Sequence, residues 1–359
     1  MPDIKPTEFI YDLDYPRLEA ILQSWGEPRY RAQQVWKGLY QHLWNHPDQF
    51  TQLPIQLRHK LGQEFTFTHL QPVQAVESSD GETCKTLFDL PDRQSIEAVL
   101  MRYGKPGSSR QRRTLCISTQ AGCGMGCTFC ATGQMGFRRH LSSGEIIEQV
   151  LYYARQLAEI DEQVTNVVLM GMGEPFHNYD ATLQAIDRLN DPYGFNFGAR
   201  RFTISTVGLI PMIKRFANEH RQVNLAISLH AVDDELRSSM LPINKKYPIQ
   251  DLLAACRDYV RKTNRRITFE WALIYGVNDT HETARQLGQL LQGLLCHVNV
   301  IPLNPTQGFQ GQATTRERAQ AFREELEKLG IPCTIRMRRG IDIQAGCGQL
   351  ATANQKKAG

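Results

Sequence analysis

Long apolar runs and secretion signals are absent from this chain of 359 residues. No stretch of 18 consecutive apolar residues occurs, so the sequence predicts no membrane-spanning helix. The first residues, Met1-Pro2-Asp3-Ile4-Lys5, are not a basic segment followed by an apolar one, and a signal peptide is therefore not expected. Internal repeats and low-complexity tracts are missing as well. We expect a folded, cytoplasmic protein that makes no contact with membranes.

Acidic residues are missing from one long window of the chain. No Asp or Glu occurs between Glu97 and Glu145, although 41 Lys and Arg nearly balance 37 Asp and Glu overall. The basic residues of this window are Arg102, Lys105, Arg110, Arg112, Arg113, Arg138 and Arg139, and a second basic cluster is Arg336, Arg338 and Arg339. A local excess of positive charge suits a polyanionic partner, although a basic run taken alone is more often a solvated loop.

The nine cysteines lack the paired C-x2-C halves of common zinc sites. Disulfide frameworks are rare in large proteins of reducing compartments, so metal or redox chemistry is the better interpretation. Cys123, Cys127 and Cys130 lie together with C-x3-C-x2-C spacing. Three thiolates hold three irons of a cubane cluster and leave the fourth iron open to a small molecule. The spacing predicts such a cluster, with a zinc knuckle or plain loop cysteines as alternatives.

Hydrophobic periodicity divides the chain into a helical start and a longer α/β part. Residues 1–70 read as a small helical domain, residues 71–113 as a β-hairpin extension with a basic loop, and residues 352–359 as a tail. Residues 114–351 alternate strands and helices, with strands expected at 115–118, 166–170, 201–205, 224–229, 267–271 and 298–302. Six strand–helix units predict a parallel sheet, open or as a partial barrel, whose ligands bind at the carboxyl ends of the strands.

Polar residues follow the carboxyl ends of several expected strands. Gly173 and Glu174 lie in Gly171–Pro175 after the second strand, and Ser205 ends the third. Ser228, Leu229 and His230 end the fourth strand, and Asn304 follows the sixth. Taken singly, each polar residue is more often part of an ordinary loop hydrogen bond, and His230 alone would rank as a general-base candidate. As a set they lie where a barrel builds its site.

The cysteine array, with Phe129 directly before its third cysteine, resembles the radical S-adenosylmethionine (SAM) superfamily. Further segments resemble the adenine-C2 RNA methyltransferase family, RlmN: Cys116–Cys123, Gly136-Phe137, Gly171–Pro175, Ile227–His230, Leu241–Tyr247, Ile301–Pro305 and Ala345–Leu350. The resemblance runs from about residue 10 to residue 351, which is nearly the whole chain.

This resemblance implies a partial (βα)6 radical-SAM barrel with an N-terminal helix–hairpin–helix-like accessory domain and a β-hairpin linker. It implies a 4Fe–4S cluster on Cys123, Cys127 and Cys130, and two SAM molecules per turnover. The residues implied to contact SAM are Gly173, Glu174, Ser205, Ser228, Leu229, His230 and Asn304. The implied substrate is adenosine 2503 of 23S rRNA, and in some members also adenosine 37 of tRNA. We expect a monomer that receives electrons from a donor such as flavodoxin or ferredoxin.

Two further thiols, Cys116 and Cys347, lie outside the cysteine array. From the residues alone, Cys116 reads as a buried small apolar residue and Cys347 as an incidental loop thiol. The resemblance implies instead that Cys347 is methylated by SAM, that a radical removes hydrogen from this methyl group, and that the methylene adds to C2 of the adenine. Cys116 would then attack the Cys347 sulfur through a transient disulfide, and Glu97 would accept the C2 proton. Cys84, Cys256, Cys296 and Cys333 are interpreted as structural.

Two alternatives stay open at this point. Methylation at C8, as in the Cfr relatives, uses the same array and the same two thiols, and a zinc-stabilised RNA-binding protein without catalysis is the second. For all of these RNA-binding functions, Arg110, Arg112 and Arg113 are expected to attract the phosphates of the RNA. An enzyme acting on an adenine carbon must also take the base out of the stack.

Overall fold

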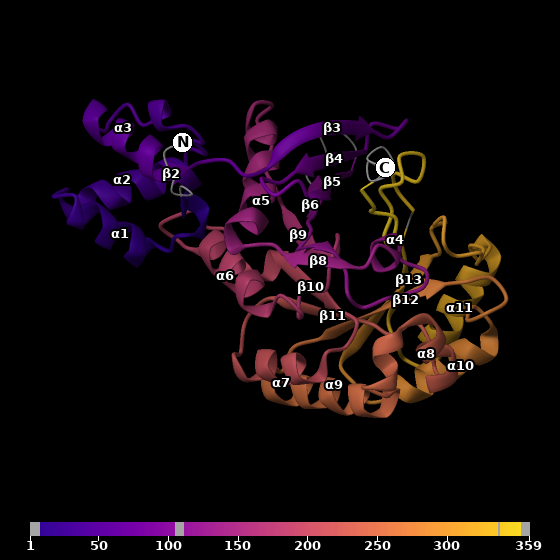
Figure 1. Ribbon diagram of the computed structural model, residues 1–359. Coiled ribbons are helices and arrows are strands. Elements are labelled where there is room, and N and C mark those ends of the chain that lie inside the picture. Colours follow the sequence, from indigo (N-terminus) through magenta and orange to yellow (C-terminus); the bar gives the residue numbers. More distant parts are fainter. Residues whose placement is uncertain (1–7, 105–110, 337, 353–359) are drawn as a thin grey trace.

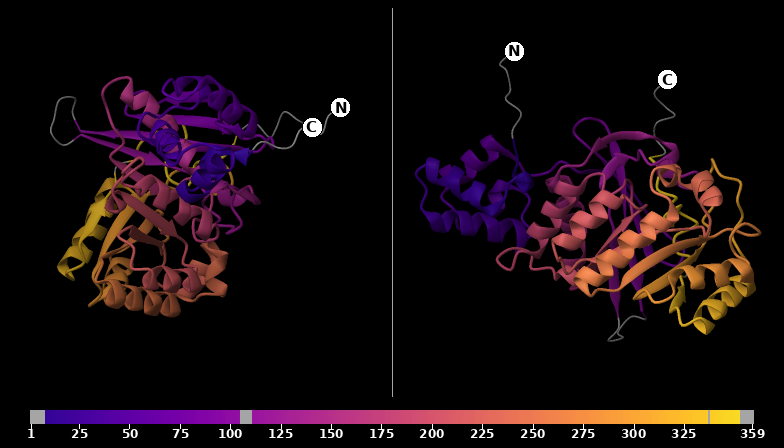
Figure 2. Two further views of the ribbon diagram at one scale, coloured as in Figure 1. Left: turned by 90° about the vertical axis from the view of Figure 1, so that its left-hand side faces the viewer. Right: turned by 90° about the horizontal axis from the view of Figure 1, so that it is seen from below.

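The computed structural model describes residues 8–104, 111–336 and 338–352 (Figure 1). Arg110 and nearly all of the expected tail lie outside these residues. A small helical domain stands at one side of a larger α/β domain, as the views in Figures 1 and 2 agree. Among the described helices, none combines the length and the apolarity that crossing a membrane requires.

The N-terminal domain is built from three short helices, as the sequence predicts. They are α1 (Tyr15–Ser24), α2 (Arg29–Tyr40) and α3 (Ile55–Glu64), with 3-10 turns at Ile10–Asp12 and Pro47–Gln49. The two-residue strands β1 (Glu8–Phe9) and β2 (Phe65–Thr66) pair in parallel and close the domain. Trp36 Nε1 donates to Asp191 Oδ2 over 2.7 Å, and Arg188 donates to the Tyr11 carbonyl, so polar contacts hold this domain against the barrel.

Ten strands form one curved sheet in the order β14-β13-β12-β11-β10-β9-β6-β5-β4-β3. The parallel strands are β6 (Arg112–Cys116), β9 (Asn166–Leu169), β10 (Phe202–Thr206), β11 (Asn224–Ser228), β12 (Ile267–Leu273), β13 (Cys296–Pro302) and β14 (Cys333–Ile335). All six expected strands are present, and the three-residue β14 was not predicted. The partial-barrel α/β fold is confirmed, with the described edges at β3 and β14 unpaired to each other.

The expected hairpin belongs to this same sheet and is not a separate linker. Strands β3 (Gln71–Glu77), β4 (Thr83–Asp89) and β5 (Ser95–Tyr103) are antiparallel, and β5 pairs with β6 through Val99 opposite Cys116. Glu97, two residues before Val99, therefore projects from the same face of the sheet as Cys116. The hairpin thus brings a carboxylate and a thiol to one surface.

Helices cover the outer side of the sheet (Figure 1). They are α5 (Ser143–Ala158), α6 (Tyr179–Asn190), α7 (Ile210–Asn218), α8 (Asp234–Met240), α9 (Ile249–Thr263), α10 (His281–Leu291) and α11 (Arg316–Lys328), with 3-10 turns at Ala199–Arg201 and Pro242–Lys245. Side chains alternate along each strand, so Phe202 and Ile204 are buried while Thr203 and Ser205 are partly exposed. The alternation therefore leaves polar side chains on the inner side of the barrel.

Candidate active site

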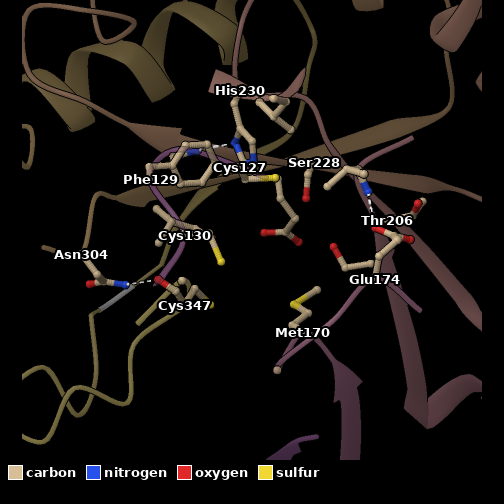
Figure 3. A pocket seen from close by; sticks show the side chains of 18 of the residues that line it. Cys127, Phe129, Cys130, Met170, Glu174, Thr206, Ser228, His230, Asn304 and Cys347 are labelled. Atoms are coloured by element: carbon tan, nitrogen blue, oxygen red, sulfur yellow. Dashed lines mark hydrogen bonds between the residues drawn. The ribbon is translucent and has the colours of Figure 1, made fainter. Parts of the chain in front are cut away.

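One pocket lies at the carboxyl ends of the parallel strands and has a volume of about 910 Å³ (Figure 3). Its lining includes most residues predicted from the sequence: Cys127, Cys130, Gly173, Glu174, Ser205, Ser228, His230, Asn304 and Cys347. Cys123, Cys116, Glu97 and Leu229 are not part of this lining. Strand ends far apart in the sequence are thus gathered around one cavity, as the parallel topology predicts.

The cysteine loop is fixed by a small two-stranded sheet. Strands β7 (Gln120–Gly122) and β8 (Phe137–His140) flank the loop and the short helix α4 (Ala131–Gln134). Gly122 has a φ of +70°, and a Cβ there would collide with the Gly136 carbonyl. The Cys123 amide donates to this same carbonyl over 2.9 Å. The loop can close this tightly only because position 122 carries no side chain.

The three thiols of the loop lie in a poorly hydrated environment. Figure 3 shows the sulfur atoms of Cys127 and Cys130 pointing into the pocket. Burial raises the pKa of Cys123 to about 12 and also raises the pKa values of Cys127 and Cys130. Thiols of this kind become ligands when a metal displaces their protons.

The donor set fits an iron–sulfur cluster. Within residues 8–104, 111–336 and 338–352, no three Cys, His, Asp or Glu side chains converge on one ion position. Three sulfurs on a single zinc would lie roughly 4 Å apart, because each Zn–S bond is about 2.3 Å. A cubane cluster gives each thiolate its own iron and tolerates a wider spread. Soft sulfur donors on one loop beside a pocket suit such a cluster and the small molecule that completes it.

Glu174 lies buried at the end of β9, and each of its two carboxylate oxygens accepts from a backbone amide. Oε1 accepts from the Phe176 amide over 3.0 Å, and Oε2 accepts from the Val207 amide over 2.9 Å. Burial raises the pKa of Glu174 to about 7 although these hydrogen bonds lower it. The carboxylate is therefore held in one orientation at the pocket wall, where it can accept from a bound ammonium or hydroxyl group.

The two glycines before Glu174 permit close approach of the chain. A Cβ at Gly173, whose φ is +103°, would lie 2.6 Å from Gln120 Cβ and 2.8 Å from its amide nitrogen. A Cβ at Gly171 would lie 2.7 Å from the Ile117 carbonyl. The turn after β9 consequently packs backbone against backbone, and this contact brings Glu174 to the pocket.

His230 faces the pocket as a hydrogen-bond donor. Its Nδ1 accepts from the Ala272 amide over 2.9 Å, so the neutral ring carries its proton on Nε2. Burial lowers the pKa of His230 to about 3. The residue has a φ of +62°, and its ring contacts Phe129 edge-on at 5.1 Å between centroids. Such a low pKa makes His230 a poor base at neutral pH, which argues against the role that it would suggest in isolation.

Of the remaining strand-end residues, Ser205 and Ser228 lie in the pocket wall and Leu229 lies behind it. Ser205 and Ser228 line the pocket directly. Leu229 is fully buried, and its carbonyl accepts from Arg237 Nε over 3.0 Å. Only main-chain atoms of Leu229 make polar contacts here, because its side chain is part of the core. The contact of Leu229 with SAM stays a prediction, and it would involve the backbone of this residue.

The C-terminal segment places Cys347 at the pocket. Asn304 Nδ2 donates to the Cys347 carbonyl over 3.1 Å, and the Ala131 amide donates to the Gly348 carbonyl over 2.7 Å. Asn304 Oδ1 is buried and has no partner among the described residues. Cys347 itself is exposed to the cavity. The segment that carries this thiol is thus held against the helix that follows the cysteine loop.

Cys116 and Cys347 line a second, smaller pocket of about 530 Å³. This pocket joins the first one, because Met170, Ile301, Asn304 and Cys347 line both. Burial raises the pKa of Cys116, and the nearby Cys347 raises it further. Both thiols are free, like the other described cysteines. The structure therefore brings together two thiols that lie 231 positions apart, as the numbers of the residues show.

Glu97 lies beside these pockets and not in their lining. Its Oε2 accepts from the Ala351 amide over 2.9 Å, and its Oε1 lies 3.0 Å from Lys85 Nζ. Burial raises its pKa, while the Lys85 charge lowers it. In this arrangement Glu97 holds the end of the segment that carries Cys347.

A wide third cavity opens on the inner side of the barrel at the amino ends of the strands. It has a volume of about 1870 Å³ and is lined by five arginines: Arg112, Arg200, Arg265, Arg266 and Arg336. None of them forms an ion pair with a described residue. Met170 and Glu270 line both this cavity and the first pocket. A cavity with five arginines and a single carboxylate, Glu270, thus adjoins the site.

The expectation for Arg113 is wrong. Arg113 is buried and forms an ion pair with Glu162 through two of its nitrogens, so it is not available to a phosphate. Arg112, its neighbour, instead lines the basic cavity and lies over the Tyr103 ring. Sequence position cannot distinguish these neighbours, because their exposure depends on the strand face to which each side chain points.

Sequence analysis missed Arg237 and Glu270. Arg237 is fully buried on α8 and donates to the carbonyls of Val207, Ser228 and Leu229, which fixes two strand ends relative to each other. Glu270 is a buried carboxylate on β12. A charged residue inside an otherwise apolar strand, as in Ile267–Leu273, was the available signal for Glu270. Cys256, Cys296 and Cys333 are buried away from these cavities, and Cys84 is half-buried.

Comparison with known families divides the chain as the fold does. Residues 117–287 match the model of the radical SAM superfamily. Residues 10–66 match the model of the ribosomal RNA large subunit methyltransferase N-terminal domain.

Curated relatives align over nearly the full length. The probable dual-specificity RNA methyltransferase RlmN of Chloroflexus aurantiacus is 49% identical over 353 residues, covering 95% of this chain and 92% of its own length. The dual-specificity RNA methyltransferase RlmN 1 of Myxococcus xanthus is 47% identical and covers 97% and 96%. The crystal structure of a radical SAM methyltransferase from Sphaerobacter thermophilus is 50% identical, with a TM-score of 0.91 and coverage of 96% and 99%.

Proposed function

The chain belongs to the RlmN family of radical SAM RNA methyltransferases, and from that premise we propose that it methylates C2 of an adenine in RNA through a methylated Cys347. The proposed substrate is adenosine 2503 of 23S rRNA, with adenosine 37 of tRNA as a second substrate, since the curated relatives carry the name dual-specificity. These RNAs place the proposed activity in the cytoplasm.

The position of Cys347 carries this proposal. Cys347 lines one pocket together with Cys127 and Cys130 of the cysteine loop, and a second pocket together with Cys116. A methyl carrier needs a methyl donor on one side and a thiol that releases the product on the other. Among the described thiols, Cys347 is the one that lines both pockets.

When bound on Cys123, Cys127 and Cys130, a 4Fe–4S cluster would supply and recover one electron, and SAM would supply the methyl group and accept a hydrogen atom. The chain's own part begins at Cys347, whose thiolate takes the first methyl group by displacement. Arg336 favours this thiolate, because its positive charge lowers the pKa of Cys347. Cys347 then presents its methyl carbon between the two pockets.

Cys116 completes the proposed reaction. After the methylene carbon has bonded to C2, the Cys116 thiolate attacks the Cys347 sulfur, so a sulfur–sulfur bond forms and the sulfur–carbon bond breaks. The electron pair of the broken bond passes to the methylene carbon, which takes up a proton and becomes the methyl group. Glu97 is the proposed acceptor of the C2 proton, since burial raises its pKa and so makes its carboxylate a stronger base.

The strand-end residues are the proposed SAM site. Glu174 offers carboxylate oxygens to the ammonium group of SAM, while Gly173 allows the backbone to approach. Ser205 and Ser228 offer hydroxyl groups, and His230 offers its Nε2 proton. Asn304 Oδ1, which lacks a partner in the described residues, offers an acceptor. We propose that these groups orient the cofactor and exclude water from it.

The basic cavity supports RNA as the substrate. Arg336 lines both this cavity and the smaller reactive pocket, and charge of this sign attracts a phosphate backbone. The target adenosine must leave the base stack to reach Cys347, and neighbouring phosphates would hold the RNA while it does so. A monomer that accepts electrons from a flavodoxin or ferredoxin remains our prediction.

Mass mapping of the methyl group tests the proposal directly. We expect the anaerobically reconstituted protein to add 14 Da to one adenosine of a 23S rRNA fragment. Comparison of the modified nucleoside with 2-methyladenosine and 8-methyladenosine should place the methyl group on C2. The Cys347→Ala variant should give no methylated RNA, although it should still cleave SAM. Methylation at C8 would contradict the C2 assignment and support the Cfr-like alternative. Zinc without iron in the reconstituted protein would contradict catalysis by this route.

A further inference from the structure

Glu270 is a buried carboxylate for which the proposed reaction has no use. It lies on β12, with 5% of its surface exposed. Its Oε1 accepts from Asn299 Nδ2 on the neighbouring strand over 3.0 Å. Its Oε2 is buried and has no hydrogen-bond partner among the described residues. A buried acceptor without a partner is unfavourable, so such an atom in a cavity wall points to a ligand that supplies a donor.

The surroundings of Glu270 locate that ligand. Together with Met170, it is one of the two residues that line both the first pocket and the basic cavity. Its charge raises the pKa of Cys347, so the two groups are close enough to interact. Arg336 is the cation that lowers the pKa of Glu270 itself, without reaching ion-pair distance. Glu270 therefore lies where the basic cavity adjoins the pocket that Cys347 lines, and its free oxygen is buried there.

We propose that Glu270 Oε2 accepts a hydrogen bond from the 6-amino group of the target adenine, which makes Glu270 a specificity-determining residue. This inference rests on the proposed function. A carboxylate is an acceptor, and adenine carries an amino donor at position 6 where guanine carries a carbonyl acceptor. A guanine in the same orientation would face acceptor to acceptor. Asn299 holds the carboxylate in place, because its amide occupies the other oxygen.

The Glu270→Gln variant tests the polarity of this contact while preserving shape. Asn299 donates to one side-chain oxygen, so if Asn299 keeps its orientation the glutamine gives its only oxygen to Asn299 and turns its NH2 group towards the ligand. The cavity would then present a donor in place of an acceptor. We therefore expect the variant to lose the preference for a 6-amino group.

The experiment pairs the enzyme variant with a substrate analogue. RNA hairpins carry either adenosine or purine riboside, which lacks the 6-amino group, at the target position. For the unmodified enzyme we expect kcat/KM to fall about 10- to 100-fold on removal of the amino group. For Glu270→Gln we expect kcat/KM on the adenosine hairpin to be about 10- to 100-fold lower than for the unmodified enzyme. The variant should lose less than a further threefold in kcat/KM when purine riboside replaces adenosine. Glu148→Gln, another buried glutamate, whose carboxylate accepts from backbone amides on the far side of the sheet from the pockets, is the matched control and should discriminate as the unmodified enzyme does.

Measurements on the cofactor identify the competing interpretation. If Glu270 instead held the ribose hydroxyls of SAM, Glu270→Gln would weaken SAM binding more than tenfold and slow RNA-independent SAM cleavage, while base discrimination stayed unchanged. That outcome would overturn the proposal, as would equal activity of the unmodified enzyme on both hairpins. If the unmodified enzyme binds these hairpins and cleaves SAM but methylates neither, the proposed function fails. Competition between the two hairpins for binding, followed by fluorescence anisotropy, would still test Glu270.

Discussion

Burial shifts the protonation of single residues at this site in different directions. It raises the pKa of Glu174 to about 7 and lowers the pKa of His230 to about 3, because in both cases the charged form loses its hydration. His230 therefore remains neutral and donates from Nε2 throughout the physiological pH range. Glu174 becomes a carboxylate most readily when an ammonium group is next to it. The same physical effect thus produces a neutral donor at His230 and a conditional anion at Glu174, and both residues line the first pocket.

At the residue scale, we predict that Cys116→Ala traps the enzyme on its RNA. Without the Cys116 thiol, nothing attacks the Cys347 sulfur, so the bond between the methylene carbon and that sulfur persists. A denaturing gel should show a slower protein band that disappears after nuclease treatment, and peptide mass spectrometry should locate a nucleotide on Cys347. Cys84→Ala removes a half-buried thiol of β4 that lines neither reactive pocket, and it should turn over normally. Free methylated RNA at normal yield from Cys116→Ala would disprove the role.

At the scale of elements, the turn after β9 determines whether the cofactor pocket can form. We predict that Gly173→Ala weakens SAM binding more than tenfold, because the new Cβ would lie 2.6 Å from Gln120 Cβ in a turn with a φ of +103°. Equilibrium dialysis with labelled SAM measures this effect. Gly276→Ala is the control: its φ is +69°, but no atom lies within 4 Å of the added Cβ. It should cost about 1 kcal/mol of stability without changing SAM affinity. Equal losses in both variants would mean that backbone strain and not the contact is responsible.

How far the sequence predicts these elements depends on whether the signal is local. The six main strands were predictable because each is a short apolar run followed by a turn, and their parallel order placed Ser205, Ser228 and Asn304 at one pocket. Strand β14 has only three residues, too few for a periodic pattern. The pairing of Arg113 with Glu162 and the unpartnered oxygen of Glu270 depend on contacts between distant strands and helices. No local pattern encodes those contacts.

At the scale of the whole molecule, cations on the outer surface and cations inside the barrel differ in whether they form ion pairs. On the outer surface, Arg261 and Lys262 of α9 pair with Asp258, which leaves little net field. Inside the barrel, the Arg265 guanidinium donates to the neutral side chains of Gln222 and Asn224 and forms no ion pair with a described residue. Arg266 follows it on the same cavity wall and is exposed. Arg261 and Lys262 are thus neutralised by an acidic residue, whereas Arg265 and Arg266, a few positions later, are not neutralised by any described residue.

We predict that this difference appears in the salt dependence of RNA binding. Each phosphate contact releases counterions, so removing two contacts from single-stranded RNA should reduce the slope of log Kd against log salt by roughly 1.4. The double variant Arg265→Ala/Arg266→Ala should show this reduction in fluorescence anisotropy titrations across several salt concentrations. Arg261→Ala/Lys262→Ala removes the same formal charge from the outer surface and should leave the slope unchanged. Equal slopes for both double variants would show that net charge, and not the basic cavity, attracts the RNA, and would place its phosphates elsewhere on the molecule.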